Sequence, residues 1–291
     1  MKAGVSFYCF NKMLVDGAIS VAAVIEFVGR DTEAECIEPL SRYWDEGRDT
    51  NEQAREAKAL CDEVGLAVSC YTLDSDFAVY DEAKHRECIA TSIARLETAQ
   101  ILGTDTIRLD PRTSLPPEAR DEPDLDEIIA RMASGMAAVA DAAAERGMTV
   151  GVDNHGRLVG RCAQIAKMVE LAARPNFGVN LDPTNFRNVF GEDHVEATRR
   201  LAPRVVHVHA KDFRIRREPR EGDDWREIPT GEWVKRAVGG SGDAQWPQML
   251  AILKAAGYDG TISLEISLPD DIQGSVAQGV ANLRRLIASL A

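Results

Sequence analysis

Residues 205–212 read VVHVHAKD, a short β-branched run that carries two histidines and a lysine and ends at an acid. Side chains of a β-strand alternate between its two faces with a period of two, so His207, His209 and Lys211 share one face. Two imidazoles and an ammonium group are costly to bury in an apolar interior unless they have polar partners there. The stretch therefore predicts a strand that carries functional groups into an interior site.

Three other strand-like runs also end at an acid. The runs at residues 148–152, 177–181 and 261–264 lead into Asp153, Asp182 and Glu265, respectively. Catalytic groups of a parallel barrel sit at the C-terminal ends of its strands, where all the ends surround one mouth. Four strands that each end in an acid or a histidine predict one convergent metal site.

The composition indicates a soluble globular protein, with 291 residues, 45% hydrophobic and 28% charged. No run of about 18 apolar residues exists, which argues against a membrane span. The N-terminus enters a strand-like segment directly and lacks the pattern of a secretory signal. The six cysteines are scattered, without paired spacing, and are expected to be reduced packing residues. A cytoplasmic location follows as the expectation.

The net charge of −13 disfavours nucleic acid as a partner, because such a surface repels polyphosphate at long range. A small sugar-like molecule is the expected partner, with no nucleic acid and no membrane. A homo-oligomer is an open possibility.

Strand-like and helix-like segments alternate throughout the chain. Strands are expected at residues 3–9, 35–38, 66–72, 104–109, 148–153, 176–182, 204–209 and 260–266. Helices are expected at residues 19–28, 51–64, 81–102, 124–146, 163–173, 193–201, 246–256 and 275–290. Eight such units without a flexible linker predict a single-domain (β/α)₈ TIM barrel over residues 1–291. A doubly wound open sheet is the alternative fold, but no glycine-rich phosphate-binding motif follows any strand.

One connection, at about residues 213–245, is unusually long. It carries Trp225 and Trp233, together with five arginines between Arg214 and Arg226. Long connections in compact domains are often lids or binding loops. We expect a lid over the barrel mouth, with a contact between subunits as the alternative.

The metal site has a defined chemistry. Asp153, Asp182, His209 and Glu265 would supply three carboxylates and one imidazole, a hard and mostly oxygen ligand set. Such a set favours Mn²⁺ or Mg²⁺, while the histidine also admits Co²⁺, Fe²⁺ or Zn²⁺. Each acid alone could be a solvated loop residue or a helix N-cap; their agreement in position argues against coincidence.

The chain resembles the xylose isomerase-like superfamily of (β/α)₈ barrels, which includes sugar phosphate isomerases/epimerases, ketose 3-epimerases, inosose dehydratases and the endonuclease IV group. Four segments carry the resemblance: 153–156 (DNHG), 180–186 (NLDPTNF), 207–212 (HVHAKD) and 263–266 (SLEI). The resemblance implies a divalent metal held by the strand-five, strand-six and strand-eight acids and by His209. It places His207 one layer deeper, as a supporting or filling residue.

The resemblance also implies roles in catalysis. Asp153 and Glu265 would be the acid/base pair that moves a proton next to a substrate carbonyl, while Asp182 and His209 would be purely structural ligands. The metal would stabilise the developing enediolate. Further substrate-binding candidates are His155, Lys211, Arg214, Asn185 and Glu38, of which Glu38 could instead form a salt bridge within the barrel rim.

Two residues depart from the epimerase pattern. Asp153 stands where those enzymes usually have Glu, and Asn185 stands where they often have His. The shorter acid reaches less far, and an amide cannot shuttle protons near pH 7. The leading hypothesis is a metal-dependent isomerase or epimerase of a small sugar, keto-sugar or cyclitol. A lyase or dehydratase acting by β-elimination is the alternative, followed by an endonuclease IV-type phosphodiesterase and a non-catalytic barrel subunit.

Three further expectations concern residues outside this set. Arg108 and Asp110 end the fourth strand with matching parity and are expected to form an internal ion pair. His85 and His194 stand in charged helical segments and are expected at the surface.

Overall fold

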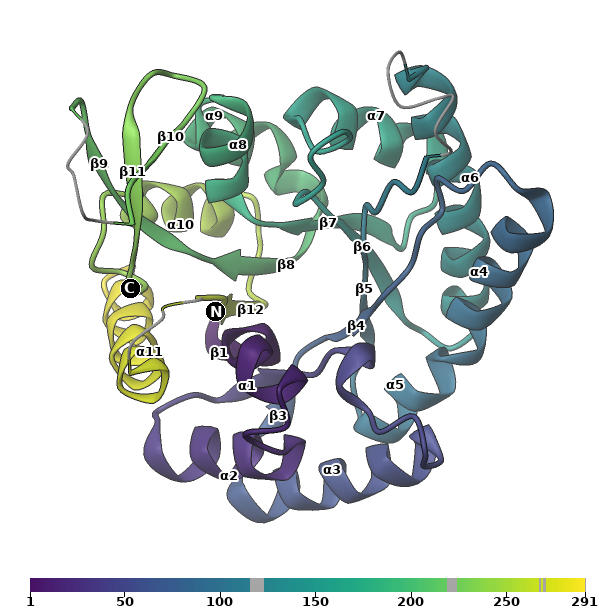
Figure 1. The fold of residues 1–291 in the computed structure, drawn as a ribbon, viewed down its shortest axis with the longest axis horizontal. Coiled ribbons are helices and arrows are strands. Elements are labelled where there is room, and N and C mark those ends of the chain that lie inside the picture. The colour runs from purple at the N-terminus through teal and green to yellow at the C-terminus, as the bar shows by residue number, and fades with distance from the viewer. Residues whose placement is uncertain (116–122, 219–223, 267, 269–270, 291) are drawn as a thin grey trace.

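The computed structural model describes residues 1–115, 123–218, 224–266, 268 and 271–290. The chain folds into a nearly closed parallel barrel with helices around its outside (Figure 1). The barrel strands are β1 (Lys2–Ser6), β2 (Cys36–Glu38), β3 (Ala67–Val68), β4 (Tyr71–Leu73), β5 (Thr106–Leu109), β6 (Thr149–Asp153), β7 (Phe177–Leu181), β8 (Val205–Ala210) and β12 (Thr261–Leu264). The predicted TIM barrel is confirmed.

The strand order is β3-β2-β1-β12-β8-β7-β6-β5-β4, and every barrel pair is parallel. The third predicted strand, residues 66–72, forms two short pieces, β3 and β4. The first piece pairs with β2 and the second with β5, so this segment closes the barrel. A bridge between Leu40 and Thr72 adds to the closure.

Helices form the outer layer of the barrel (Figure 1). They are α1 (Asn11–Val15), α2 (Val21–Asp31), α3 (Thr50–Val64), α4 (Glu82–Ala94), α5 (Leu96–Leu102), α6 (Leu125–Ala144), α7 (Cys162–Ala172), α8 (Pro183–Phe190), α9 (His194–Leu201), α10 (Trp246–Ala255) and α11 (Ile272–Ala288). Their apolar stripes pack on the outward face of the sheet, as in α6, whose Ile128, Met132, Met136 and Val139 are fully buried. None of the helices in the described ranges is long and apolar enough to span a membrane.

Some expected boundaries were wrong. The first strand stops at Ser6, because the Ser6 hydroxyl accepts the Tyr8 amide and starts the 3-10 helix η1 (Phe7–Phe10). The helix expected at 81–102 is divided at Arg95 into α4 and α5. His85 and His194 are 8% and 2% exposed, not surface residues; their rings lie against Phe77 and Phe213, respectively.

The long connection at 213–245 contains regular structure. β9 (Asp212–Arg216), β10 (Arg226–Glu227) and β11 (Trp233–Ala237) form an antiparallel sheet in the order β10-β11-β9. This small sheet lies beside α8 and α9, away from the barrel strands β4 and β5 (Figure 1). Residues 219–223 of the connection lie outside the described residues, and whether the connection moves as a lid stays a prediction.

Candidate functional site

The four predicted metal ligands meet at the C-terminal mouth of the barrel. Asp153 ends β6, Asp182 follows β7, His209 lies on β8 and Glu265 follows β12. Ligand atoms of Asp182, His209 and Glu265 all lie within 4.8 Å of one another. Asp153 Oδ2 lies 3.5 Å from His209 Nδ1. The strand-end pattern therefore converges as the sequence predicted.

His209 lies between carboxylates on both sides of its ring. Nε2 is 2.9 Å from Glu38 Oε2, and Nδ1 is 2.8 Å from Glu265 Oε2. Burial alone would lower the pKa of His209, but the charges of Glu38 and Glu265 outweigh it and raise the pKa to about 10. The two carboxylates thus hold the ring in a fixed orientation.

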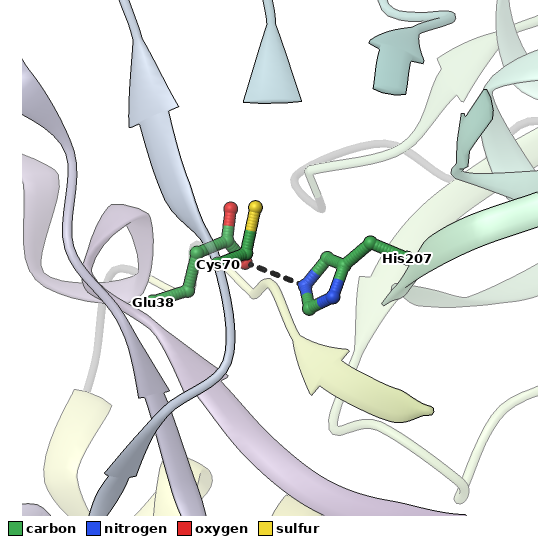
Figure 2. Close-up of side chains that lie close together, drawn as sticks. All are labelled: Glu38, Cys70 and His207. Atoms are coloured by element: carbon green, nitrogen blue, oxygen red, sulfur yellow. Dashed lines mark hydrogen bonds and ion pairs between the residues drawn. The ribbon is translucent and has the colours of Figure 1, made fainter. Parts of the chain in front are cut away.

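Glu38, Cys70 and His207 lie close together (Figure 2), and Glu38 also contacts His209. Glu38 accepts a 2.7 Å hydrogen bond from the Thr72 hydroxyl, and His207 Nε2 is 3.3 Å from its Oε2. Both oxygens of Glu38 already contact donors, and burial raises the pKa of the Cys70 thiol well above its usual value. These three residues therefore suit packing around His209 better than binding of a second metal ion. The position of His207 as a residue that supports the site matches the sequence-based expectation.

Asp182 is fixed through the backbone that carries it. It is the N-cap of α8, with Pro183 at the first helical position, a combination that helices favour. The Asn154 side chain accepts the Asp182 amide at 2.8 Å and donates to the Asp182 carbonyl at 2.9 Å. Thr184 Oγ1 donates to Asp182 Oδ1 at 2.8 Å. The carboxylate therefore enters the site in a preset orientation.

Lys211 is a cation that contacts two of the acids, Asp182 and Glu265. Its Nζ lies 2.6 Å from Asp182 Oδ2 and 2.6 Å from Glu265 Oε1. Burial would lower the pKa of Lys211, but the two carboxylates raise it, so the side chain is an ammonium ion. For Glu265, burial acts in the opposite sense, yet Lys211 and His209 hold its pKa well below the usual range. Glu265 is consequently ionised at neutral pH.

Asp153 is bound by an arginine and by an amide side chain. Arg108 Nε donates to Asp153 Oδ2 at 2.6 Å, and the Asn180 amide donates to the same oxygen at 2.9 Å. Burial would raise the pKa of Asp153, but the Arg108 guanidinium, followed by His155, keeps it below its usual value. The expected Arg108–Asp110 pair exists at 3.3 Å, but the contact of Arg108 with Asp153 is the shorter. This environment favours an anchoring role for Asp153 over proton transfer.

A cavity of about 200 Å³ opens beside these groups. Its wall includes Glu265 and Lys211 from the barrel and Asn185 from α8. The remaining lining residues are Tyr8, Asn188, Asp212, Phe213, Arg226, Val234, Lys235, Arg236, Ala237 and Ile266. Glu265 therefore connects the ligand cluster to a space that a small molecule can enter.

The predicted substrate-binding residues occupy different positions around this cavity. Lys211 and Asn185 line it. His155 is about one-third exposed, with Nδ1 3.3 Å from Asp153 Oδ1, and lies outside the lining. Glu38 is fully buried beneath His209, a position that favours orienting the ring over touching substrate. Arg214 is exposed, 3.3 Å from Asp243, and does not line the cavity.

Several site residues were missed in the sequence. Thr72 is an ordinary strand residue without a local motif, and Asn180 lies in the 180–186 segment but received no role of its own. The contacts of both residues are visible only once neighbouring strands pair. Arg226 lies in the long connection, where five arginines gave no reason to select it. The alternation of side chains along the strand showed that Arg108 points inward. It did not show that Asp153 on the next strand is its closer partner.

The residues present fit a divalent cation. Asp182, His209 and Glu265 supply two carboxylates and one imidazole close together, and Glu38 contacts the imidazole nitrogen that faces away from Glu265. A carboxylate on the second nitrogen is the usual support of a metal-ligating histidine. Asp153 would be a fourth ligand only in competition with its contact to Arg108. Lys211 likewise competes with a cation for Asp182 and Glu265.

Sequence comparison finds relatives of this fold. A family model described as a xylose isomerase-like TIM barrel matches residues 29–286. The uncharacterized protein YfiH of Bacillus subtilis (strain 168) is 34% identical over 120 aligned positions, and the match covers 38% of this chain. The match spans 36% of that relative, about a third of its length.

Solved structures with the same fold include proteins of different activities. An IOLI protein with a binding zinc atom has a TM-score of 0.73 at 16% identity, covering 100% of this chain and 99% of that one. D-psicose 3-epimerase, solved in the presence of D-fructose, has a TM-score of 0.74 at 15% identity, covering 99% of each chain. The probable 3-DHS dehydratase AsbF from Bacillus anthracis has a TM-score of 0.71 at 15% identity, covering 98% of this chain and 99% of that one. At these identities the likeness shows the fold alone.

Proposed function

The chain belongs to the xylose isomerase-like TIM barrel family, and on that premise we propose that it is a divalent-metal-dependent isomerase or epimerase. The proposed substrate is a small sugar, keto-sugar or cyclitol, from which a proton is removed next to a carbonyl. One observation carries the proposal: Glu265 contacts His209 and Lys211 and also lines the cavity. A carboxylate base, a candidate ligand and a cation thus adjoin one substrate-sized space.

Each residue of the site has a separate role in the proposed reaction. The ionised Glu265 carboxylate accepts the proton from the substrate carbon. The Lys211 ammonium, which lines the same cavity, stabilises negative charge that develops on the substrate oxygen. Asn185 offers an amide donor to a substrate hydroxyl. When bound by Asp182, His209 and Glu265, a divalent cation would supply a Lewis acid that stabilises the enediolate.

The arrangement of Asp153 supports a second candidate, a lyase that acts by β-elimination. Epimerisation at one carbon needs acid/base groups on two faces of the substrate, and Asp153 is 1% exposed and bound to Arg108. Glu265 is the one carboxylate of the ligand set that lines the cavity within the described residues. A single base suffices for elimination or for a proton shift on one face.

The proposal predicts solvent deuterium exchange by the metal-loaded protein. Purified protein is stripped with a chelator, reloaded with Mn²⁺, Mg²⁺, Co²⁺ or Zn²⁺, and incubated in D₂O with a panel of ketoses and inososes. Mass spectrometry should detect one deuterium in substrate or product only after reloading, and NMR of the product separates isomerisation from loss of water. Metal-loaded protein that exchanges no member of the panel would contradict both candidates.

Glu38 is expected to tune the metal site without touching substrate. Glu38→Gln weakens the contact with His209 Nε2, and loss of such a partner typically lowers metal affinity by about 10–100-fold. Isothermal titration of Mn²⁺ or Zn²⁺ into the stripped protein measures this effect independently of activity. Glu35→Gln is the matched control, because Glu35 is exposed just before β2, at the opposite end of the strand. Equal metal affinity in the two variants would refute the role assigned to Glu38.

A further inference from the structure

Lys211 contacts the same carboxylates that are proposed to bind the metal. Its Nζ lies 2.6 Å from Asp182 Oδ2 and 2.6 Å from Glu265 Oε1, so one ammonium group bridges two of the three clustered ligand candidates. The third candidate, His209, has its Nδ1 2.8 Å from the other oxygen of Glu265. Lys211 thus holds carboxylates that a metal ion would need.

The two carboxylates offer a metal ion few oxygens that Lys211 does not already contact. Asp182 Oδ1 accepts the Thr184 hydroxyl at 2.8 Å, which leaves Oδ2, the oxygen that Lys211 contacts, for a further ligand. Glu265 meets Lys211 through one oxygen and His209 through the other. A divalent cation bound by these acids would therefore share their oxygens with a second positive charge. Because like charges at short range repel strongly away from bulk water, the cation and the ammonium group compete for the acids.

Lys211 can leave the acids without a change in its backbone. The residue directly follows β8, and Trp246 Nε1 donates to its carbonyl at 2.9 Å, which fixes the backbone at that point. The Lys211 side chain is 28% exposed and lines the cavity, whereas Asp182 is fully buried. A lysine carries a compact charge on a flexible four-carbon stem, so rotation within the side chain is enough to move that charge. The displaced ammonium group can therefore turn into the cavity.

We propose that Lys211 changes partners when the metal binds: it gives up Asp182 and Glu265, and its ammonium group becomes available to a substrate oxygen in the cavity. The proposal rests on the proposed function, because it takes the metal ligands from it. Lys211 thereby couples the metal site to the substrate site. Because coupling between two binding sites is reciprocal, metal and substrate should each favour the binding of the other.

Metal titration of lysine variants tests the competition. Lys211→Met removes the charge that opposes the metal, so the stripped variant should bind Mn²⁺ about 10-fold more tightly than the wild type, within the range usual for coupled sites. Lys211→Gln also lacks the charge and should show the same tightening, which separates the effect of charge from that of methionine packing. Isothermal titration calorimetry without substrate gives the dissociation constants. Lys167→Met is the matched control and should leave Mn²⁺ affinity unchanged, because Lys167 on α7 pairs with Asp126 at 2.7 Å.

Lysine labelling measures the release directly in the wild-type protein. A short pulse of an N-hydroxysuccinimide acetate reagent acetylates accessible amines, and mass spectrometry of the digested protein reports the rate at each lysine. Saturating Mn²⁺ should speed the acetylation of Lys211 several-fold, because the amine leaves the two carboxylates that shield it. The rate at Lys167 should stay the same, because its partner Asp126 is not a candidate ligand.

The outcomes separate this inference from the proposed function. Equal Mn²⁺ affinity in Lys211→Met and the wild type, or a Lys211 acetylation rate that Mn²⁺ does not raise, would overturn the inference alone. Failure of both the wild type and the Lys211 variants to bind Mn²⁺ would overturn it together with the proposed metal site. If Mn²⁺ releases Lys211 but no substrate exchanges deuterium, the inference stands and the proposed function fails.

Discussion

Glu265→Gln is expected to abolish solvent deuterium exchange into substrate, with a rate loss of about 10²–10⁴-fold for removal of a general base. The substitution keeps the shape of the side chain but removes the oxygen charge that accepts the proton. It also removes one of the charged partners of Lys211 and of His209. The rate is measured by mass spectrometry on metal-loaded protein at saturating substrate.

Two controls separate the base from the ligand role of Glu265. Glu170→Gln alters an exposed acid on α7 and should leave exchange intact. Metal affinity of Glu265→Gln is measured by titration, and exchange is compared at metal concentrations that saturate the variant. Exchange at the wild-type rate in saturated Glu265→Gln protein would show that another group removes the proton.

Arg108→Met should destabilise the fold strongly, by about 3–5 kcal/mol, the cost typical of leaving one partner of a buried ion pair unpaired. Asp153 and Asp110 are both 1% exposed, and Arg108 is the shared cation between them. Methionine fills part of the volume of the arginine stem, so the loss reports mainly on charge. Urea unfolding at pH 7, followed by circular dichroism, measures the change.

Arg112→Met is the matched control, because Arg112 is half exposed and lies 3.5 Å or more from Asp74 and Asp110. It should cost less than about 1 kcal/mol, as exposed ion pairs do. The Arg108→Met/Asp153→Asn double variant should recover part of the deficit. An Arg108→Met variant as stable as Arg112→Met would disprove the structural role of this pair.

The same pair sets a pH dependence with a definite sign. Arg108 lowers the pKa of Asp153 in the folded protein, so its stabilisation is complete above the unfolded pKa of about 4. It is lost progressively as the pH falls below that value. The stability difference between wild type and Arg108→Met should therefore shrink in acid, which unfolding curves at pH 7 and below pH 4 can measure.

The fold was predictable because its signal is local and repeated. Period-two runs that end in an acid or a histidine identify parallel strands, and the VVHVHAKD stretch placed one of them unambiguously. The breaks at Ser6 and Arg95 were not predicted. The first depends on a single cap hydrogen bond and the second on an interruption of one residue, and apolar periodicity is insensitive to both.

The meeting of Asp182, His209 and Glu265 was predictable for the same reason, since strand ends share one mouth, while their binding of a metal stays a prediction. The partners of these side chains were not predictable. Whether Arg108 binds Asp110 or Asp153 depends on the distance to the neighbouring strand, and whether Glu38 reaches substrate or His209 depends on its depth in the barrel. The small sheet in the long connection also escaped prediction, because the pairs of β9 with β11 join residues about 20 apart in the chain.

The small sheet has a consequence for how specificity could change in evolution. All its residues come from one contiguous stretch, 212–237, whereas the ligand candidates come from four separate barrel strands. Replacing that stretch alters one wall of the cavity without rebuilding the proton-transfer centre. Exchange of this segment between related barrels is therefore a direct route to enzymes that share a reaction and select different molecules.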